Sequence, residues 1–294
     1  MDFNFTELEN KIVEAEKIDF NKILRDSYID PSEEIKPQPV AVSIGSSIYK
    51  GSSFAIPFGS YGDFSCIVGA SKSRKTFFKS MVIAGYIGGT ANLLNPSLKG
   101  HDSRDKMVIE FDTEQSKYHT QRVVRRVCDM VGGSPDFYKT FSLRQYSPKE
   151  RFEFIDWVIF ESEYKNNIGL LSIDGYVDLV TDFNNLEQAT GLTEKLLQWT
   201  ASGNMHITGI LHKNFGTAKP VGHVGSAVLK KAETVAFIDT DKDTGYTNVK
   251  CEYSRNIPFE DLHFAVNDDW LPYEIQDIKI DNLPHNKKTR TAKF

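Results

Sequence analysis

The stretch FSCIVGASKSRKTFF, residues 64–78, combines three features that decide the fold. Its first five residues form an apolar run typical of a buried strand. A short loop of small and basic residues follows, from Gly69 to Arg74, and a helical pattern opens at Lys75 and Thr76. A strand, a curl of backbone N–H groups and a helix N-terminus together make a phosphate-binding loop. The sequence fits the pattern GxxxxGK[ST], except that Arg74 occupies the place of the second glycine.

Each part of this loop has an expected role toward a nucleotide. Lys75 is expected to reach the β- and γ-phosphates, and the Thr76 hydroxyl to bind Mg²⁺. Arg74 is expected to adopt an ordinary helix-entry conformation and to add a planar donor near the phosphates. A basic surface turn before a helix is the alternative. The residues expected to bind ATP are Gly69, Ala70, Ser71, Lys72, Ser73, Arg74, Lys75, Thr76 and Phe77.

Apolar runs alternate with helical patterns through the rest of the chain. Runs without period-two alternation, separated by helices, indicate a parallel sheet buried on both faces. The fold class predicted is doubly wound α/β, with the turn at residues 239–245 joining two strands as an antiparallel hairpin at the edge. Strands are expected at residues 64–68, 107–111, 168–174, 206–212 and 234–238, and helices at 75–85, 117–131, 149–164, 185–201 and 226–231.

Two segments flank this core. Residues 1–38 predict an amphipathic helical arm over residues 4–25, followed by a linker with Pro31 and Pro37 and with Pro39 directly after it. The arm is too short to bury its apolar stripe alone, so the stripe is expected to pack on the main body or on a neighbouring subunit. Residues 39–280 are expected to form the α/β domain. The basic residues 281–294 are expected to be a flexible tail.

Composition limits the classes of protein. The 294 residues include 35 Lys and Arg against 40 Asp and Glu, a net charge of −5, so any nucleic-acid contact must be local. Three widely spaced cysteines favour free thiols in a reducing compartment. The N-terminus lacks a signal pattern, and no apolar run is long enough to span a membrane. We therefore expect a cytoplasmic protein that does not enter membranes.

Acidic residues follow two of the expected strands. Asp174 ends the run LLSID, where it would lie beside the phosphate loop and bind Mg²⁺, unless it only begins a turn. Asp112 and Glu114 end the run MVIEFDTE. A carboxylate there is placed to activate a water molecule, and Glu114 is the expected base. Glu110, within the strand, is the weaker candidate, and Asp112 is an alternative cap for the next helix.

The order of phosphate loop, DTE strand, LLSID strand, ILHKN and closing hairpin resembles the RecA-type ATPase core over residues 40 to 260. FSCIVGASKSRKTFF, SIDGYVDLV and GILHKNFGTAKPVGHVGSAVLKKAETVAFI are similar to the RepA-like, KaiC/RadA-related ATPases carried by bacterial mobile elements and phages. The resemblance implies that Arg74 is a tolerated variant. It also implies that Glu114 is the catalytic base and that His212 is the sensor of the γ-phosphate.

The same resemblance implies a homo-oligomer, either a hexameric ring or a filament, in which one subunit completes its neighbour's site. The basic residues in the corresponding place are Lys250 and Arg255. Arg255 is the expected trans-acting arginine, because an arginine stabilises charge that develops on the transferred phosphoryl group. A surface arginine paired with Glu252 or Glu260 is the alternative.

One loop predicts a contact with single-stranded DNA. Residues 213–225 carry three basic side chains, one aromatic ring and three glycines, a combination suited to a single-stranded backbone and base stacking. A mobile loop with ordinary solvated lysines is the alternative. The acidic loop at residues 175–185 is not expected to touch phosphates. The candidate nucleic-acid contacts are Lys213, Phe215, Lys219 and His223.

Three functions are compatible with these features. The leading one is a RecA-type ATPase that forms a ring on DNA and acts as a replicative helicase, translocase or helicase-loading factor. The second is a repair or recombination accessory that binds DNA without unwinding it. The third is a KaiC-like switch that acts on protein partners, which the acidic net charge favours. The lack of a primase, a zinc module or a large N-terminal domain disfavours unwinding by this chain alone. A replication or defence protein is an expected partner.

Overall fold

The computed structural model describes residues 18–103, 105–213 and 222–276. Contacts divide the chain into two compact units, Met1–Pro37 and Gln38–Phe294, and each is described by itself.

In the first unit, helix α2 spans Phe20–Ser27. The Asp19 carboxylate caps it by accepting a hydrogen bond from the backbone N–H of Lys22 at 3.0 Å. None of the side chains of α2 is buried. The prediction of one helix over residues 4–25 is therefore wrong at Ile18 and Asp19, which are not helical, and at its end, since α2 runs to Ser27; its part before residue 18 lies outside the described residues.

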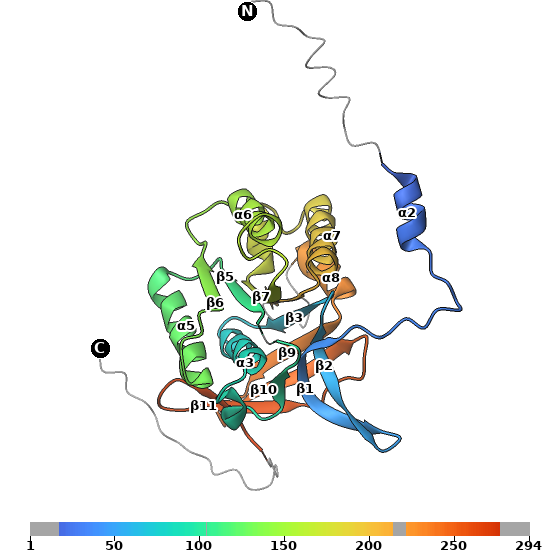
Figure 1. The fold of residues 1–294 in the computed structure, drawn as a ribbon. Coiled ribbons are helices and arrows are strands. Elements are labelled where there is room, and N and C mark those ends of the chain that lie inside the picture. The colour runs from blue at the N-terminus through green and yellow to red at the C-terminus, as the bar shows by residue number, and fades with distance from the viewer. Residues whose placement is uncertain (1–17, 104, 214–221, 277–294) are drawn as a thin grey trace, which may run out of the picture. The chain divides into compact units, whose positions relative to one another are not determined.

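The second unit is built on a nine-stranded sheet in the order β12-β11-β10-β9-β3-β8-β7-β5-β6. The six strands from β9 to β6 pair in parallel, and the three beyond β9 pair antiparallel. The predicted α/β class and the hairpin after β9 are thus confirmed (Figure 1). The strands are β3 (Phe64–Gly69), β5 (Met107–Asp112), β6 (Tyr138–Ser142), β7 (Ile168–Asp174), β8 (His206–His212), β9 (Thr234–Thr240), β10 (Thr247–Ser254), β11 (Leu262–Val266) and β12 (Pro272–Glu274).

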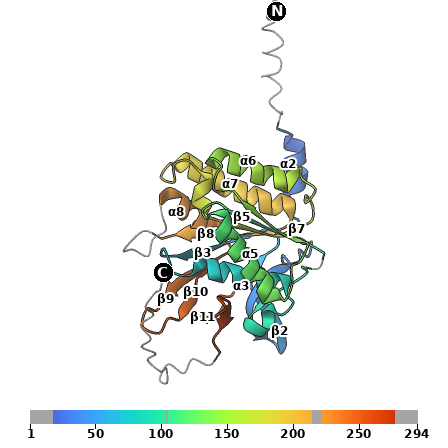
Figure 2. The ribbon, with the colours of Figure 1, turned by 90° about the vertical axis from the view of Figure 1, so that its left-hand side faces the viewer.

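Helices cover both faces of the parallel strands, as Figures 1 and 2 show. Side chains of α6, α7 and α8 belong to one buried apolar cluster, and side chains of α3 and α5 belong to the other. The strands between them are therefore apolar on both faces, which is why their sequences are continuous apolar runs. The helices are α3 (Lys75–Ile87), α4 (Ala91–Leu94), α5 (Lys117–Val131), α6 (Pro148–Phe160), η1 (Tyr176–Leu179), α7 (Leu186–Gly203) and α8 (Gly222–Lys231).

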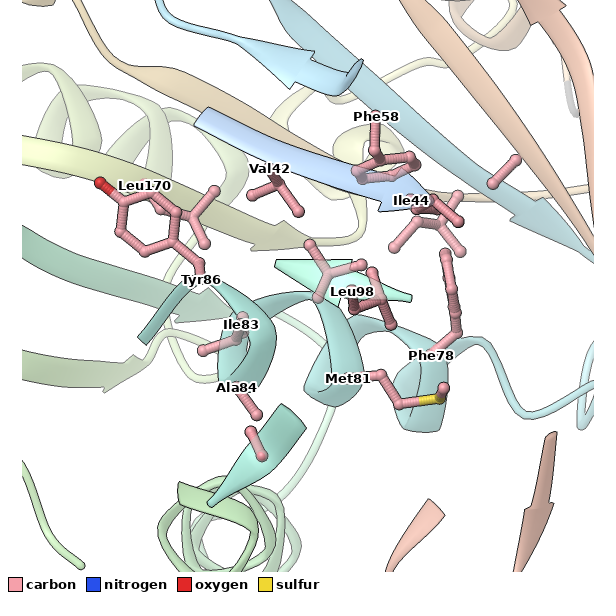
Figure 3. Close-up of a cluster of buried hydrophobic side chains, with 14 of the residues drawn as sticks. Val42, Ile44, Phe58, Phe78, Met81, Ile83, Ala84, Tyr86, Leu98 and Leu170 are labelled. Carbon is pink, nitrogen blue, oxygen red and sulfur yellow. The ribbon is translucent and has the colours of Figure 1, made fainter. Parts of the chain in front are cut away.

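A second sheet, which the sequence did not predict, packs on α3. Its strands are β1 (Val40–Tyr49), β2 (Ser52–Ser60) and β4 (Leu98–Gly100), in the order β2-β1-β4. Figure 3 shows Val42 and Ile44 of β1 facing Phe78 of α3 within one apolar cluster. Helix α3, which follows the phosphate loop, is therefore clamped between two sheets.

Three further expectations concern the cysteines, membrane-spanning helices and the basic tail. The three cysteines are free. Among the helices in the described residues, none has the length and apolar character required to traverse a bilayer. The expected basic tail at residues 281–294 lies outside the described part of the chain.

Candidate active site

The phosphate loop lies between the end of β3 and the start of α3, at the middle of the sheet. Strand β3 pairs with β8 on one side and β9 on the other. Gly69 ends it, and a Cβ there would lie 2.5 Å from both the Ile238 carbonyl oxygen and the Ser73 Oγ. Only glycine fits this position without displacing its neighbours.

The Lys75 side chain turns back over the loop. Its Nζ donates hydrogen bonds to the carbonyl oxygens of Gly69, at 3.0 Å, and Ala70, at 2.7 Å. Burial lowers the pKa of Lys75 to about 8. Ser73 lies beside it, and its buried Oγ has no hydrogen-bond partner among the described residues. The loop thus holds a cation and an unpaired hydroxyl, which fits an anion such as a phosphate group.

Arg74 departs from the predicted helix-entry conformation. Its φ of 68° and ψ of 24° place it in the left-handed region, which is the conformation that glycine adopts most readily. Its guanidinium group also turns away from the loop. Nη1 donates to the carbonyl oxygen of Gly245 at 2.6 Å and to Thr247 Oγ1 at 3.3 Å, in the β9–β10 hairpin. In this structure Arg74 therefore fastens the loop to the hairpin instead of offering a donor to phosphates.

A cavity of about 500 Å³ opens beside the loop and α3. It receives side chains from the carboxyl ends of several parallel strands, the edge where ligands bind in open α/β sheets. The lining includes predicted residues from the loop together with Glu114, Asp174 and His212. The lining residues are Ser71, Lys72, Ser73, Arg74, Lys75, Thr76, Phe77, Glu114, Gln115, His119, Arg122, Val123, Arg126, Asp174, Ile210, His212 and Trp270.

Glu114 and His212 meet across this cavity. Glu114 Oε2 lies 3.4 Å from His212 Nε2, and the Glu114 side chain is 58% exposed. A hydrogen bond from His212 lowers the pKa of Glu114, and Lys75 and Lys79 act in the same direction. Glu114 is therefore an accessible carboxylate that stays ionised at neutral pH, as a general base must.

The loop that carries Glu114 is held from both sides. The Asp112 carboxylate accepts hydrogen bonds from the backbone N–H of Gln115, at 2.8 Å, and from Thr120 Oγ1, at 2.9 Å. Thr113 Oγ1 donates to Asp178 Oδ2 at 2.7 Å and to the Asp174 carbonyl oxygen. Asp112 thus ties the loop to α5 through the Thr120 side chain; it is not the cap considered for it, because Ser116 is the N-cap of α5.

A buried lysine beneath the cavity was not anticipated. The Lys79 ammonium, on α3, is fully buried and lies 2.7 Å from Asp174 Oδ2 and 2.6 Å from Glu110 Oε1. Glu110 also accepts hydrogen bonds from the Tyr138 hydroxyl and, at 3.3 Å, from Thr140 Oγ1. Because Glu110 is buried and occupied by these groups, it is not placed to act on a water molecule, and its candidacy as a base was wrong.

Beside the predicted Phe77, the cavity is lined by Arg122, Arg126 and Trp270, which sequence reasoning missed. The Arg126 guanidinium lies 3.8 Å from the centre of the Phe77 ring, and burial lowers its pKa to about 10. The Phe77 and Trp270 rings stack at 6.5 Å, and Arg122 lies 5.4 Å from the Trp270 ring centre. The spacing of the two arginines by one helical turn on α5 is the only local signal for them, because Trp270 comes from a distant turn.

Arg255 lies at the opposite edge of the sheet. Its Nη1 is 2.9 Å from Asp63 Oδ2, just before β3, and its Nη2 donates to the Lys231 carbonyl oxygen. It does not pair with Glu252 or Glu260 in these contacts, so the expected surface pairing has a different partner. Because β3 begins at this edge and the phosphate loop follows its other end, Arg255 does not line the cavity.

Lys250 is also away from the cavity, with its Nζ 3.7 Å from Asp261 Oδ2. The predicted DNA-binding residues are described only in part. Lys213 Nζ lies 4.9 Å from the centre of the Phe237 ring, and His223 is exposed in the first turn of α8. Phe215 and Lys219 lie outside the described residues.

The donor set of the cavity fits a nucleotide with its magnesium ion. Thr76 and Asp174 both line it and supply a hydroxyl and a carboxylate, the hard oxygen ligands that Mg²⁺ prefers. Within the described residues, no group of three His, Cys, Asp or Glu side chains is arranged to hold a metal ion alone. A magnesium site here therefore needs oxygen atoms from phosphates and water, which is the usual arrangement in nucleotide sites.

The comparisons agree with this geometry at the level of the fold. No protein-family model matches the sequence, and no curated protein matches it. The crystal structure of the RadB recombinase is similar, with a TM-score of 0.51 at 15% sequence identity, covering 75% of this chain and 93% of that one. The mostly parallel sheet, its flanking helices and its antiparallel C-terminal strands give this chain a RecA-like α/β core.

Proposed function

We propose that this chain is a RecA-type ATPase that binds and hydrolyses ATP in the cavity beside the phosphate loop. One observation carries the proposal: Lys75, Glu114, Asp174 and His212 come from four separate segments and line one cavity. A nucleotide triphosphate needs a cation for its phosphates, oxygen ligands for its magnesium ion and a base for the attacking water. The cavity supplies each of these groups.

The phosphate groups would occupy the loop. The Lys75 ammonium now bonded to two loop carbonyls would turn to the phosphates, and the unpaired Ser73 hydroxyl would gain a partner. Thr76 and Asp174 would hold Mg²⁺, which neutralises phosphate charge when bound. Arg122 and Trp270 offer planar faces suited to a purine base at the other end of the cavity.

Glu114 is proposed to orient the attacking water and accept its proton. Its carboxylate is exposed to the cavity and ionised, and its loop is fixed by the Thr113 and Asp112 contacts. His212 contacts the same carboxylate from the end of β8. His212 is proposed to sense the γ-phosphate, because loss of that group would change the surroundings of Glu114.

Assembly into a hexameric ring or a filament, in which Arg255 serves a neighbour's cavity, is part of the proposal. An arginine at the opposite edge of the sheet cannot serve its own cavity but can serve a neighbour's, as an arginine finger in trans. In the described chain it is held by Asp63 and a carbonyl oxygen, so engagement with a neighbour would exchange these partners. Lys250 is the second basic candidate, and residues 1–38 are proposed as an arm that docks on the adjacent subunit.

DNA is the proposed macromolecular substrate. Lys213 and His223 flank the segment that carries Phe215 and Lys219, beside the carboxyl edge where the cavity opens. The structural neighbour is titled a recombinase, which favours a recombination or repair accessory over a helicase or translocase. The narrower grouping with ATPases of mobile elements and phages rests on the sequence phrases alone.

A second candidate is a nucleotide-dependent switch that acts on a protein partner, which the net charge of −5 favours. One experiment separates the candidates. ATP hydrolysis by the full chain is measured with and without single-stranded DNA, and mass photometry follows its assembly under both conditions. Stimulation and assembly by DNA support the recombination function, and strand separation of a forked duplex would support a helicase. An ATPase indifferent to DNA would point to the switch, and a chain that neither binds nor hydrolyses ATP would refute the proposed function.

A further inference from the structure

Three charged groups lie buried together directly beneath the proposed nucleotide site. Lys79 is on α3, one helical turn after Lys75, and its side chain is 0% exposed. Glu110 is on β5 and Asp174 is at the end of the adjacent strand β7. These three side chains, Lys79, Glu110 and Asp174, are called the buried trio below. Their formal charges of +1, −1 and −1 leave one negative charge.

Lys79 carries its proton in this environment. Burial alone would lower the pKa of Lys79, but Asp174 and Glu110 outweigh it and raise the pKa above the ordinary value. A buried ammonium ion is tolerated only when carboxylates compensate its lost hydration. The carboxylates at 2.6 and 2.7 Å provide that compensation.

The two carboxylates of the buried trio have different surroundings. Glu110 is enclosed, with Oε1 at Lys79 and Oε2 accepting from Tyr138 and Thr140. Asp174 reaches the cavity, where it is the only carboxylate on the lining besides Glu114 among the described residues. The Lys79 ammonium group therefore influences the cavity through its contact with Asp174. Glu110 holds the ammonium group in place from the enclosed side.

We propose that Lys79 is a positioning residue that fixes the Asp174 carboxylate and weakens its attraction for Mg²⁺. This inference rests on the proposed function. Lys79 hydrogen-bonds to Oδ2, which leaves Oδ1 for other partners and restricts rotation of the carboxylate. A positive charge next to that carboxylate also repels a divalent cation bound to it. A magnesium site weakened in this way would release Mg²⁺ together with ADP more readily than a site whose aspartate has no lysine beside it.

The test removes the ammonium together with the enclosed carboxylate of Glu110, so that Asp174, which lines the cavity, is the one charged group of the trio that remains. Lys79→Met alone would leave Glu110 as a buried, unpaired carboxylate, which is strongly destabilising. The double variant Lys79→Met/Glu110→Gln avoids this, because its trio keeps one negative charge on Asp174. Glu110→Gln alone is the matched control, since it retains the lysine beside Asp174. A second double variant, Lys79→Gln/Glu110→Gln, removes the charge but keeps a neutral donor.

Binding of a fluorescent, non-hydrolysable ATP analogue is measured in full-length protein while MgCl₂ is titrated, with urea unfolding as a check on the fold. Both double variants are expected to need about three to ten times less Mg²⁺ for half-maximal binding than Glu110→Gln, because the three proteins share Gln at position 110 and differ only in the ammonium that opposes the cation. The control is expected to need no less than wild type. A merely structural lysine would leave this requirement unchanged.

The outcomes separate two failures. If the wild type binds the analogue with a clear Mg²⁺ requirement and both folded double variants have the same requirement as Glu110→Gln or a higher one, the role of Lys79 is refuted while the proposed function stands. If the wild type does not bind the analogue at any Mg²⁺ concentration, the proposed function fails and this inference falls with it.

Discussion

The guanidinium group of Arg74 donates a hydrogen bond to the backbone carbonyl of Gly245 at 2.6 Å, which joins the phosphate loop to the β9–β10 hairpin. An arginine thus stands in a left-handed conformation where the motif has glycine, and a tertiary contact offsets the conformational strain. The same contact engages Nη1 of the guanidinium group with the hairpin, although Arg74 still lines the cavity.

Substitution of Arg74 tests whether the hairpin contact offsets the strain of the left-handed conformation. Arg74→Gly should remove the strain and the hairpin contact together, so its free energy of unfolding should stay within about 1 kcal/mol of wild type. ATP affinity should change by less than about tenfold, or 1.4 kcal/mol, because the side chain does not face the phosphates. Arg74→Ala is the matched control. It keeps the strain and loses the contact, so urea denaturation should show it less stable than Arg74→Gly by about 1 kcal/mol.

Lys75 and Glu114 should have separable roles. Lys75→Ala should abolish ATP binding, whereas Glu114→Gln should bind ATP normally and lose hydrolysis, because the first residue holds phosphate and the second acts on water. Equilibrium binding of labelled ATP and phosphate release measure the two steps. Hydrolysis at the wild-type rate by Glu114→Gln would show that another group is the base.

Arg255 should matter only in the assembled protein. Arg255→Ala should bind ATP with near-normal affinity and hydrolyse it about 10³-fold more slowly, the scale expected for a lost arginine finger. A mixture with Lys75→Ala should recover part of the activity, because some interfaces then pair an intact loop with an intact arginine. Lys250→Ala is the control for general loss of basic charge. Failure of the two variants to complement at any ratio, while both still assemble, would contradict the shared site.

His206 should make stability depend on pH. It is fully buried, with Nε2 2.9 Å from Ser65 Oγ and Nδ1 3.1 Å from the Ser60 carbonyl oxygen. Burial lowers the pKa of His206 to about 4. Since the unfolded chain protonates this histidine near its ordinary pKa of about 6.5, stability should be lost as pH falls from 6.5 toward 4, by up to about 1.4 kcal/mol per pH unit.

Urea unfolding at pH 7 and pH 5 measures the effect. His206→Gln should be less stable at pH 7 but should show a flatter dependence on pH over this range. The exposed His223→Gln should follow the wild-type curve. An unchanged slope for His206→Gln would assign the dependence to other groups.

The sequence predicted the parts of the fold that are set by local patterns. Strands β7 and β8 and helix α5 have the predicted bounds, because their apolar runs and helical spacing are strong. Strands β1 and β2 escaped prediction, since their serines and glycines weaken the apolar pattern and their stability comes from packing on α3. The short edge strand β6 is stabilised by its pairing with β5, which no local signal reveals.

In the site, too, the sequence predicted the residues that local patterns reveal and missed those that depend on distant contacts. Asp174 and Glu114 were predicted to approach the loop because residues at or just after the ends of parallel strands gather at one edge of the sheet, whereas His212 was named through the resemblance to RecA-type ATPases. Lys79 was missed because its partners come from strands far away in the sequence. Its one signal is that a charged residue interrupts the apolar run of α3, which is typical of a buried partner.

The buried contact between Lys79 and Glu110 also constrains how this protein can evolve. Loss of either partner alone would strand a buried charge and destabilise the fold by about 3 to 5 kcal/mol, so single changes at these positions should be selected against. Homologues are therefore expected to inherit the two residues together or to replace both, with neutral side chains at both positions in lineages that lack the lysine. Covariation between positions 79 and 110 in an alignment would then distinguish the homologues in which a lysine lies beside Asp174 from those in which a neutral residue does.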